Sequence, residues 1–103
     1  MKELTFEQLR KANFKRSNAS YNSINWSPLE WGGALAGETG ELCNFLKKLK
    51  RGEKISKKDI AYELADVILY ADLLASHMDI NLGESVREKF NVVSKRKKSK
   101  IKL

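Results

Sequence analysis

Residues 27–52 read SPLEWGGALAGETGELCNFLKKLKRG, and this stretch decides the fold class. It opens with serine, proline and glutamate in the order typical of a helix N-terminus. It closes at Gly52, after four basic residues that complement the negative C-terminal end of a helix. Its apolar residues recur at helical spacing. The stretch therefore predicts one long helix over about residues 28–51.

Two acids of this helix, Glu38 and Glu41, fall on the face that its apolar residues predict to be buried. Downstream, Glu63 and Asp66 repeat the i, i+3 spacing, with Glu63 on the apolar side of its helix and Asp66 at the margin. An unpaired carboxylate turned toward a core is very costly. These acids imply a neutralising partner, and a bound cation is the simplest one.

Three further helices are expected around the long one. A capping box at residues 5–8 predicts a short helix over about 5–15, with Leu9, Ala12 and Phe14 as buried candidates. A second capping box at 56–59 predicts a helix over 57–77, and a more polar helix is expected over 83–96. Residues 17–26, rich in Ser and Asn, and residues 79–81 are expected to form a loop and a turn. The sequence predicts an all-α, four-helix bundle-like domain over residues 1–96.

Composition describes an ordinary globular chain of one domain, with 103 residues, 42% hydrophobic and 32% charged. No apolar run is long enough to span a bilayer, and the N-terminus lacks a signal-peptide pattern, so the cytoplasm is the expected location. One cysteine, Cys43, and one histidine, His77, cannot form a disulfide or a zinc-type ligand set within one chain. Any metal site is therefore expected to use oxygen ligands.

The formal net charge of +7 is concentrated in one short segment. Residues 95–103 hold six Lys or Arg and no acid, which leaves 7 − 6 = +1 for the rest of the chain. Residues 97–103 are expected to be a flexible basic tail, and such tails are more often solvated than bound to a partner. Contact with nucleic acid is expected only through this tail, as a secondary interpretation.

Mg²⁺, with Mn²⁺ as an alternative, prefers the hard oxygen ligands that these acids offer. Two helices that each present a pair of acids can hold such a cation between them. A di-iron site would need Glu-x-x-His, and no histidine follows either pair at that spacing. The alternative interpretation is that the acids lie on the surface and pair with lysines of their own helix. Four glycines between residues 32 and 40 cost roughly 1 kcal/mol each relative to alanine, and close helix packing or close approach of a ligand would offset that cost.

Four segments together resemble a known family: WGGALAGETGEL (31–42), KKLKRG (47–52), ELADVILY (63–70) and the closing segment from Lys89 to Arg96. They are similar to the MazG-like nucleotide pyrophosphohydrolases of the all-α NTP pyrophosphatase superfamily, over about residues 26–96. The resemblance implies an α-helical dimer or tetramer that uses Mg²⁺ to cleave a (d)NTP into the monophosphate and pyrophosphate, in nucleotide-pool housecleaning.

The resemblance also implies roles for individual residues. The metal ligands would be Glu38, Glu41, Glu63 and Asp66, and Glu38 and Glu41 are also the catalytic candidates; which acid is the general base stays open. Many family members carry a further glutamate where this chain has Gly37, although some single-domain members share the glycine. The candidate contacts to the phosphates and the base are Lys48, Arg51, Lys89, Asn91, Arg96, Trp31 and Tyr70. For the aromatic residues core packing is an equally consistent role, and for Lys48 and Arg51 so is a solvated helix end.

Two rival hypotheses remain at this point. A non-enzymatic helical protein would bind nucleotide or use the basic tail on nucleic acid, and would keep the acids as structural charges. A nucleotide sensor would keep the fold and bind nucleotide without turnover. The sequence does not identify the preferred base or sugar, because no motif in it reports the shape of the base pocket.

Overall fold

The computed structural model describes residues 2–20 and 25–103, which form four α-helices and no strand. They are α1 (Phe6–Ser20), α2 (Pro28–Lys50), α3 (Lys57–His77) and α4 (Leu82–Arg96). The prediction of an all-α chain is confirmed. The bounds of α2, α3 and α4 agree with the predicted ranges to within one residue.

Helix α2 begins where the sequence predicts because Ser27 and Glu30 form a reciprocal capping box, with proline at the first helical position. Gly52, at φ +86°, follows its last turn. A conformation with positive φ costs glycine little, and this allows the chain to turn back toward α3.

Helices α3 and α4 begin at caps of the same kind. In α3 the Ser56 and Asp59 side chains each accept a hydrogen bond from the other residue's backbone N–H. In α4 the Asn81 side chain accepts from the backbone of Glu84. These side chains accept from backbone N–H groups at the helix start that no helical carbonyl can reach, which fixes both starts.

Helix α1 is longer than predicted, because it continues through Ser20 and not only to about residue 15. Residues 17–20, expected as loop, are therefore helical, while residues 21–24 of that expected loop lie outside the described part of the chain. The buried face of α1 consists of Leu9, Asn13 and Ser17, at spacing i, i+4, i+8. Two of these three residues are polar, so the apolar pattern ends too early to predict the helix end.

The structure also corrects which residues of α1 are buried. Leu9 is buried as predicted, but Ala12 and Phe14 are exposed. Asn13 takes their place in the interface because its side-chain amide donates to the Leu69 carbonyl and to the Asp72 carboxylate on α3. A buried polar side chain is tolerated where such partners satisfy it.

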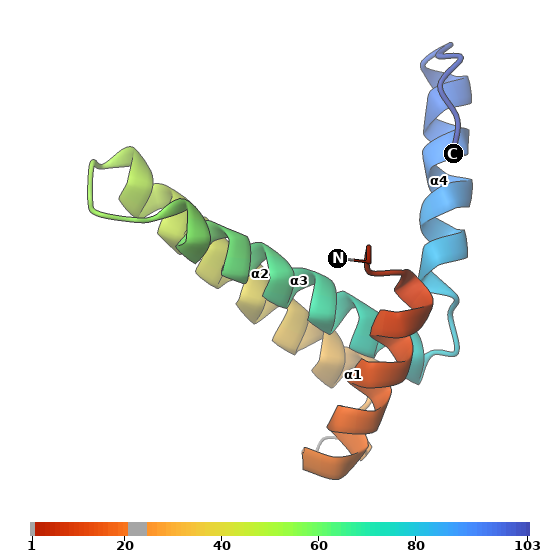
Figure 1. Ribbon diagram of the computed structural model, residues 1–103, viewed down its shortest axis with the longest axis horizontal. Coiled ribbons are helices and arrows are strands. Elements are labelled where there is room, and N and C mark those ends of the chain that lie inside the picture. Colours follow the sequence, from red (N-terminus) through yellow and green to blue (C-terminus); the bar gives the residue numbers. More distant parts are fainter. Residues whose placement is uncertain (1, 21–24) are drawn as a thin grey trace.

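The helices make bundle-like contacts around α3 (Figure 1). Helices α2 and α3 form an antiparallel hairpin and lie side by side along their length, while α1 packs across the C-terminal half of α3. Arg10 on α1 pairs with Asp72 on α3 at 3.0 Å and also donates to the Ile80 carbonyl. This ion pair ties α1 to the end of the hairpin.

Helix α4 diverges from the hairpin and contacts α1, so the four helices do not close around one core (Figure 1). The Cα radius of gyration is 16.0 Å. A compact chain of this length has a radius of about 13 Å. Large apolar side chains stay exposed as a result, among them Leu46, Leu49, Tyr62, Leu64, Ile68, Val86, Phe90 and Val92.

None of the helices in the described residues combines the length and the apolarity needed to cross a membrane.

Candidate metal site between α2 and α3

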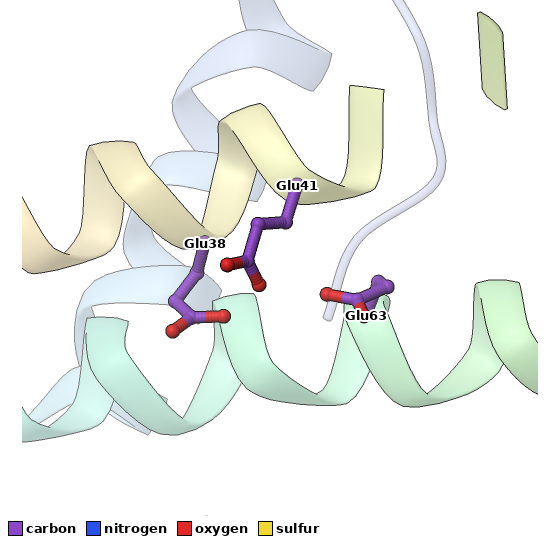
Figure 2. A group of neighbouring side chains, drawn as sticks. All are labelled: Glu38, Glu41 and Glu63. Carbon is purple, nitrogen blue, oxygen red and sulfur yellow. The ribbon is translucent and has the colours of Figure 1, made fainter. Parts of the chain in front are cut away.

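Three of the four predicted acids meet between the two long helices. Glu38 and Glu41 extend from α2 and Glu63 from α3, and Figure 2 shows the three side chains gathered in the space that separates the helices. One carboxylate oxygen of each lies within 4.8 Å of the others. Because the hairpin is antiparallel, residues 22 or more positions apart in sequence become neighbours here. The inward-facing pattern predicted that these acids meet, but Glu41 is exposed and not buried as expected.

The spacing can be compared with what a cation requires. Two oxygens bound to one Mg²⁺ at 2.0–2.1 Å lie about 3 Å apart when adjacent and about 4 Å apart when opposite. The 4.8 Å limit of the cluster is slightly wider than this. Glutamate side chains rotate about three bonds, so this spacing is compatible with a shared cation.

Burial and mutual repulsion raise the pKa of two of the three carboxylates. For Glu38, burial is the first cause, followed by the charges of Glu41 and Asp66, a hydrogen bond with Glu41, and the charge of Glu63. For Glu63, burial again comes first in raising the pKa, followed by Glu41, Asp66 and Asp59, and a hydrogen bond with Glu41. Both groups therefore hold protons more tightly than a free glutamate.

Each of these two glutamates also holds an oxygen that lacks a hydrogen-bond partner. The Oε2 atoms of Glu38 and Glu63 are buried and unpaired within the described part of the chain. A buried oxygen of this kind is destabilising unless something replaces the lost water. Within the same residues, no lysine or arginine forms an ion pair with Glu38, Glu41, Glu63 or Asp66. The alternative interpretation, surface acids paired with lysines, lacks those pairs.

Asp66 lies beside the cluster and not within it. It is half-buried on α3, one turn after Glu63, and its charge contributes to the raised pKa of both Glu38 and Glu63. It is not among the acids whose oxygens approach within 4.8 Å. The structure thus gathers three of the four acids and keeps the fourth at their edge.

The glycines of α2 lie in open space. A methyl group added at Gly32, Gly33, Gly37 or Gly40 would meet no atom within 4 Å beyond its chain neighbours and the nearby backbone of its own helix. Close packing within this chain therefore does not account for them, although the sequence offers that as one of two explanations. Gly37 and Gly40 each precede an acid of the cluster, so the surface beside the carboxylates is open to a ligand or to another copy of the chain.

Trp31 and Tyr70 lie in an aromatic cluster nearer the end of the hairpin at which α2 begins and α3 ends. Trp31 is 1% exposed, and its ring centroid lies 4.8 Å from Trp26, 4.7 Å from His77 and 6.4 Å from Tyr70. Glu38 follows Trp31 by seven residues, or about 10 Å along the helix. The Nε1 atom of Trp31 is buried and lacks a hydrogen-bond partner among the described residues.

The sequence assigned no role to His77, which is half-buried against Trp31 with its Nδ1 atom 3.1 Å from the Leu73 carbonyl oxygen. The spacing of His77 from Tyr70 in the sequence could have predicted that the two side chains lie together. His77 follows Tyr70 by seven residues, which places both on one face of α3.

The predicted phosphate contacts are dispersed. Lys48 lies near the end of α2 with its Nζ 5.5 Å from the centre of the Phe45 ring, and Arg51 pairs with Glu53 at 2.7 Å. Lys89 and Arg96 are exposed on α4, which diverges from the hairpin. The Asn91 side chain donates to the Leu103 carbonyl and accepts from the Leu103 N–H. The structure does not bring these five residues together around the acids of the same chain.

Comparisons of the chain with protein-family models, with curated proteins and with solved structures found no match.

Proposed function

We propose that this protein is a Mg²⁺-dependent nucleoside triphosphate pyrophosphohydrolase of the MazG-like type, which converts a (d)NTP and water to the (d)NMP and pyrophosphate. The observation that carries the proposal is the convergence of Glu38, Glu41 and Glu63 from two helices, with buried oxygens that lack partners. The order of the sequence motifs supports the same family.

Glu38, Glu41 and Glu63 would hold the cation, with Asp66 as a further ligand or as a hydrogen-bond acceptor for its water. A magnesium ion bound there would offset charge on the triphosphate oxygens and on the leaving pyrophosphate, and would acidify a nearby water. The chain's own contribution is to bring carboxylates from two helices together in one place.

Glu38 and Glu41 are the candidates for the general base. A carboxylate is a better base when its pKa lies closer to neutrality, and burial and neighbouring acids raise the pKa of Glu38. Glu41 is the more exposed of the two and lies beside the open surface at Gly37 and Gly40. Glu38 is therefore favoured by its pKa and Glu41 by its access to solvent.

The proposed oligomer is a homodimer or homotetramer. Apolar side chains remain exposed on the hairpin and on α4, with Val86 at 41% and Phe90 at 40%. A second copy packed on these faces would remove that surface from water. It would also offer a route by which Lys89 and Arg96 of one copy approach the acids of another.

The experiment that tests the proposal is a panel of the common NTPs and dNTPs incubated with Mg²⁺, with pyrophosphate, monophosphate and orthophosphate measured separately. We expect pyrophosphate and monophosphate in equal amounts from at least one nucleotide. Nucleotide binding without turnover would favour a sensor. Inactivity and absence of binding on the whole panel would contradict the proposal.

A further inference from the structure

We propose that residues 91–102 form a second binding site, a basic cleft that takes the phosphate backbone of a nucleic acid without regard to sequence. This inference uses none of the four acids and rests on the lysines of α4 and the tail, although Asn91 and Arg96 of the same segment are also candidate substrate contacts.

Charge is the first observation. Residues 82–103 hold eight Lys or Arg and two Glu, which gives a net charge of 8 − 2 = +6. Residues 1–81 hold twelve Lys or Arg and eleven Asp or Glu, which gives a net charge of 12 − 11 = +1. None of the six cations between Lys95 and Lys102 forms an ion pair in the described residues. A cluster of cations without acidic partners attracts polyanions.

The second observation is that the tail has a defined path. The sequence predicts a flexible tail, which would present its charges in no fixed arrangement. In the structure the chain turns back along α4, with Lys98 at φ 57° and the Ser99 N–H donating to the Ser94 carbonyl. The Asn91 amide then holds both backbone groups of Leu103, at 3.1 and 2.9 Å.

This path places three of the lysines along one hollow. Lys95, Lys98 and Lys102 line an open cleft of about 870 Å³ between α4 and the tail. Asn91, Val92 and Ser99 complete its lining, and Glu88 is the one acid in it. Three exposed ammonium groups along one cleft suit a ligand with regularly repeated negative charges, such as the phosphates of a nucleic acid.

An anionic membrane is the main alternative for a basic amphipathic segment. The apolar groove of α4, lined by Val86, Phe90, Val93 and Ile101 with Lys89 and Lys97 beside them, is a separate hollow from the basic cleft. Ser99 of the tail borders both hollows, so the tail separates them. The three lysines of the basic cleft lie outside the apolar groove, so a nucleic acid needs this cleft alone, whereas a bilayer would take up the apolar side chains of the groove.

The test uses the full chain and fluorescein-labelled 20-nucleotide single-stranded DNA, single-stranded RNA and duplex DNA, with fluorescence anisotropy as the readout. The variant K95Q/K98Q/K102Q removes the three lysines of the cleft. The matched control K54Q/K57Q/K58Q removes the same charge from exposed positions around the start of α3. Thermal melting by circular dichroism checks that both variants fold.

We expect the wild type and the control to bind in 50 mM salt, with affinity that falls steeply as salt rises. The cleft variant should bind at least tenfold more weakly, and its log K against log[salt] slope should be shallower by about 2 to 3, since each lost phosphate contact changes the slope by roughly 0.7–0.9. Equal affinity of the cleft variant and the control would overturn the inference. So would sedimentation of the protein with phosphatidylglycerol vesicles combined with no binding to any oligonucleotide.

Discussion

Glu38 and Glu63 each carry a raised pKa, and this links the stability of the metal-free protein to pH. A carboxyl whose pKa in the folded state exceeds its ordinary value of 4.5 binds protons more tightly in the folded chain than in the unfolded chain. Its contribution to stability is therefore present at low pH and is lost as pH rises through the raised pKa. Asp59 affects stability in the opposite direction, because hydrogen bonds from Ser56 lower its pKa below 3.8. Its contribution to stability is present above that pH and is lost as the pH falls through the lowered pKa.

The first prediction concerns Glu63→Gln. Without metal, we expect the wild type to lose stability as pH rises from 4.5 toward 8, and the variant to lose less, since one of the repelling charges is gone. Addition of Mg²⁺ at pH 8 should stabilise the wild type and should stabilise the variant much less. Urea unfolding with and without Mg²⁺ measures both effects.

Glu88→Gln is the matched control, because Glu88 is an exposed carboxylate on α4. It should respond to pH and to Mg²⁺ as the wild type does. Equal stabilisation of wild type and Glu63→Gln by Mg²⁺ would mean that Glu63 does not hold the ion.

Gly37 supports a second prediction at the residue scale. A methyl group there meets no atom of the chain within 4 Å, so Gly37→Ala should raise the free energy of unfolding by about 1 kcal/mol through helix propensity alone. If a nucleotide approaches this surface, the same variant should turn over more slowly. A lower free energy of unfolding for Gly37→Ala than for the wild type, measured in urea, would contradict the expected stabilisation.

The acids show how far sequence predicts a site. Glu38, Glu41 and Glu63 were placed on inward faces by counting helical positions, and the structure gathers them. Asp66, at the margin of its arc by the same count, lies at the edge of the cluster. His77 was expected as a surface or partly buried residue at a helix end, and it is half-buried at the end of α3. Its packing on Trp31 depends on where two helices meet, which the sequence does not show.

At the scale of elements, caps proved more informative than apolar periodicity. Helices α2 and α3 each start at a capping box, in which side chains accept hydrogen bonds from backbone N–H groups three residues away. A few neighbouring residues are therefore enough to predict where each helix starts. The end of α1 depends instead on the burial of Ser17 and on Asn13, which donates to Leu69 and Asp72 of α3, more than fifty residues away. No local pattern in α1 reports that contact.

The pair between Arg10 and Asp72 gives the prediction for this scale. Asp72 is 1% exposed, and Arg10→Ala would leave its charge buried without its cationic partner. Loss of one partner from a buried pair costs roughly 3–5 kcal/mol, and the partial exposure of Arg10 favours the lower end, about 3 kcal/mol. Chemical unfolding at pH 7 measures the loss. Lys11→Ala, which removes an exposed pair with Glu7, is the control and should change stability by less than about 1 kcal/mol.

At the scale of the whole molecule, the position of α4 was beyond prediction from the sequence. The sequence predicts Val86, Phe90 and Val93 as the buried stripe of α4, but Val86 and Phe90 are 41% and 40% exposed. An apolar pattern does not show whether its face is covered by the same chain or by another one. The structure shows it diverging from the hairpin with its apolar groove exposed.

The proposed oligomer predicts the effect of Phe90→Lys. We expect the wild type to elute as a dimer or tetramer in size-exclusion chromatography with light scattering, and the variant to shift toward the monomer. Phe14→Lys, also at an exposed phenylalanine but on α1, is the control and should leave the mass unchanged. A monomeric wild type at micromolar concentration would contradict the proposed assembly.

The central claim is that the acids between α2 and α3 carry a metal-dependent hydrolysis, and one measurement tests it most directly. The initial rate of pyrophosphate release from the best nucleotide of the panel is compared for wild type, Glu41→Gln, Asp66→Asn and Glu88→Gln, with Mg²⁺ and with EDTA. We expect the wild type and Glu88→Gln to release pyrophosphate only with Mg²⁺. With Mg²⁺, Glu41→Gln and Asp66→Asn should release it at least a hundredfold more slowly than the wild type. Undiminished pyrophosphate release by Glu41→Gln, or equal release in EDTA, would contradict the claim.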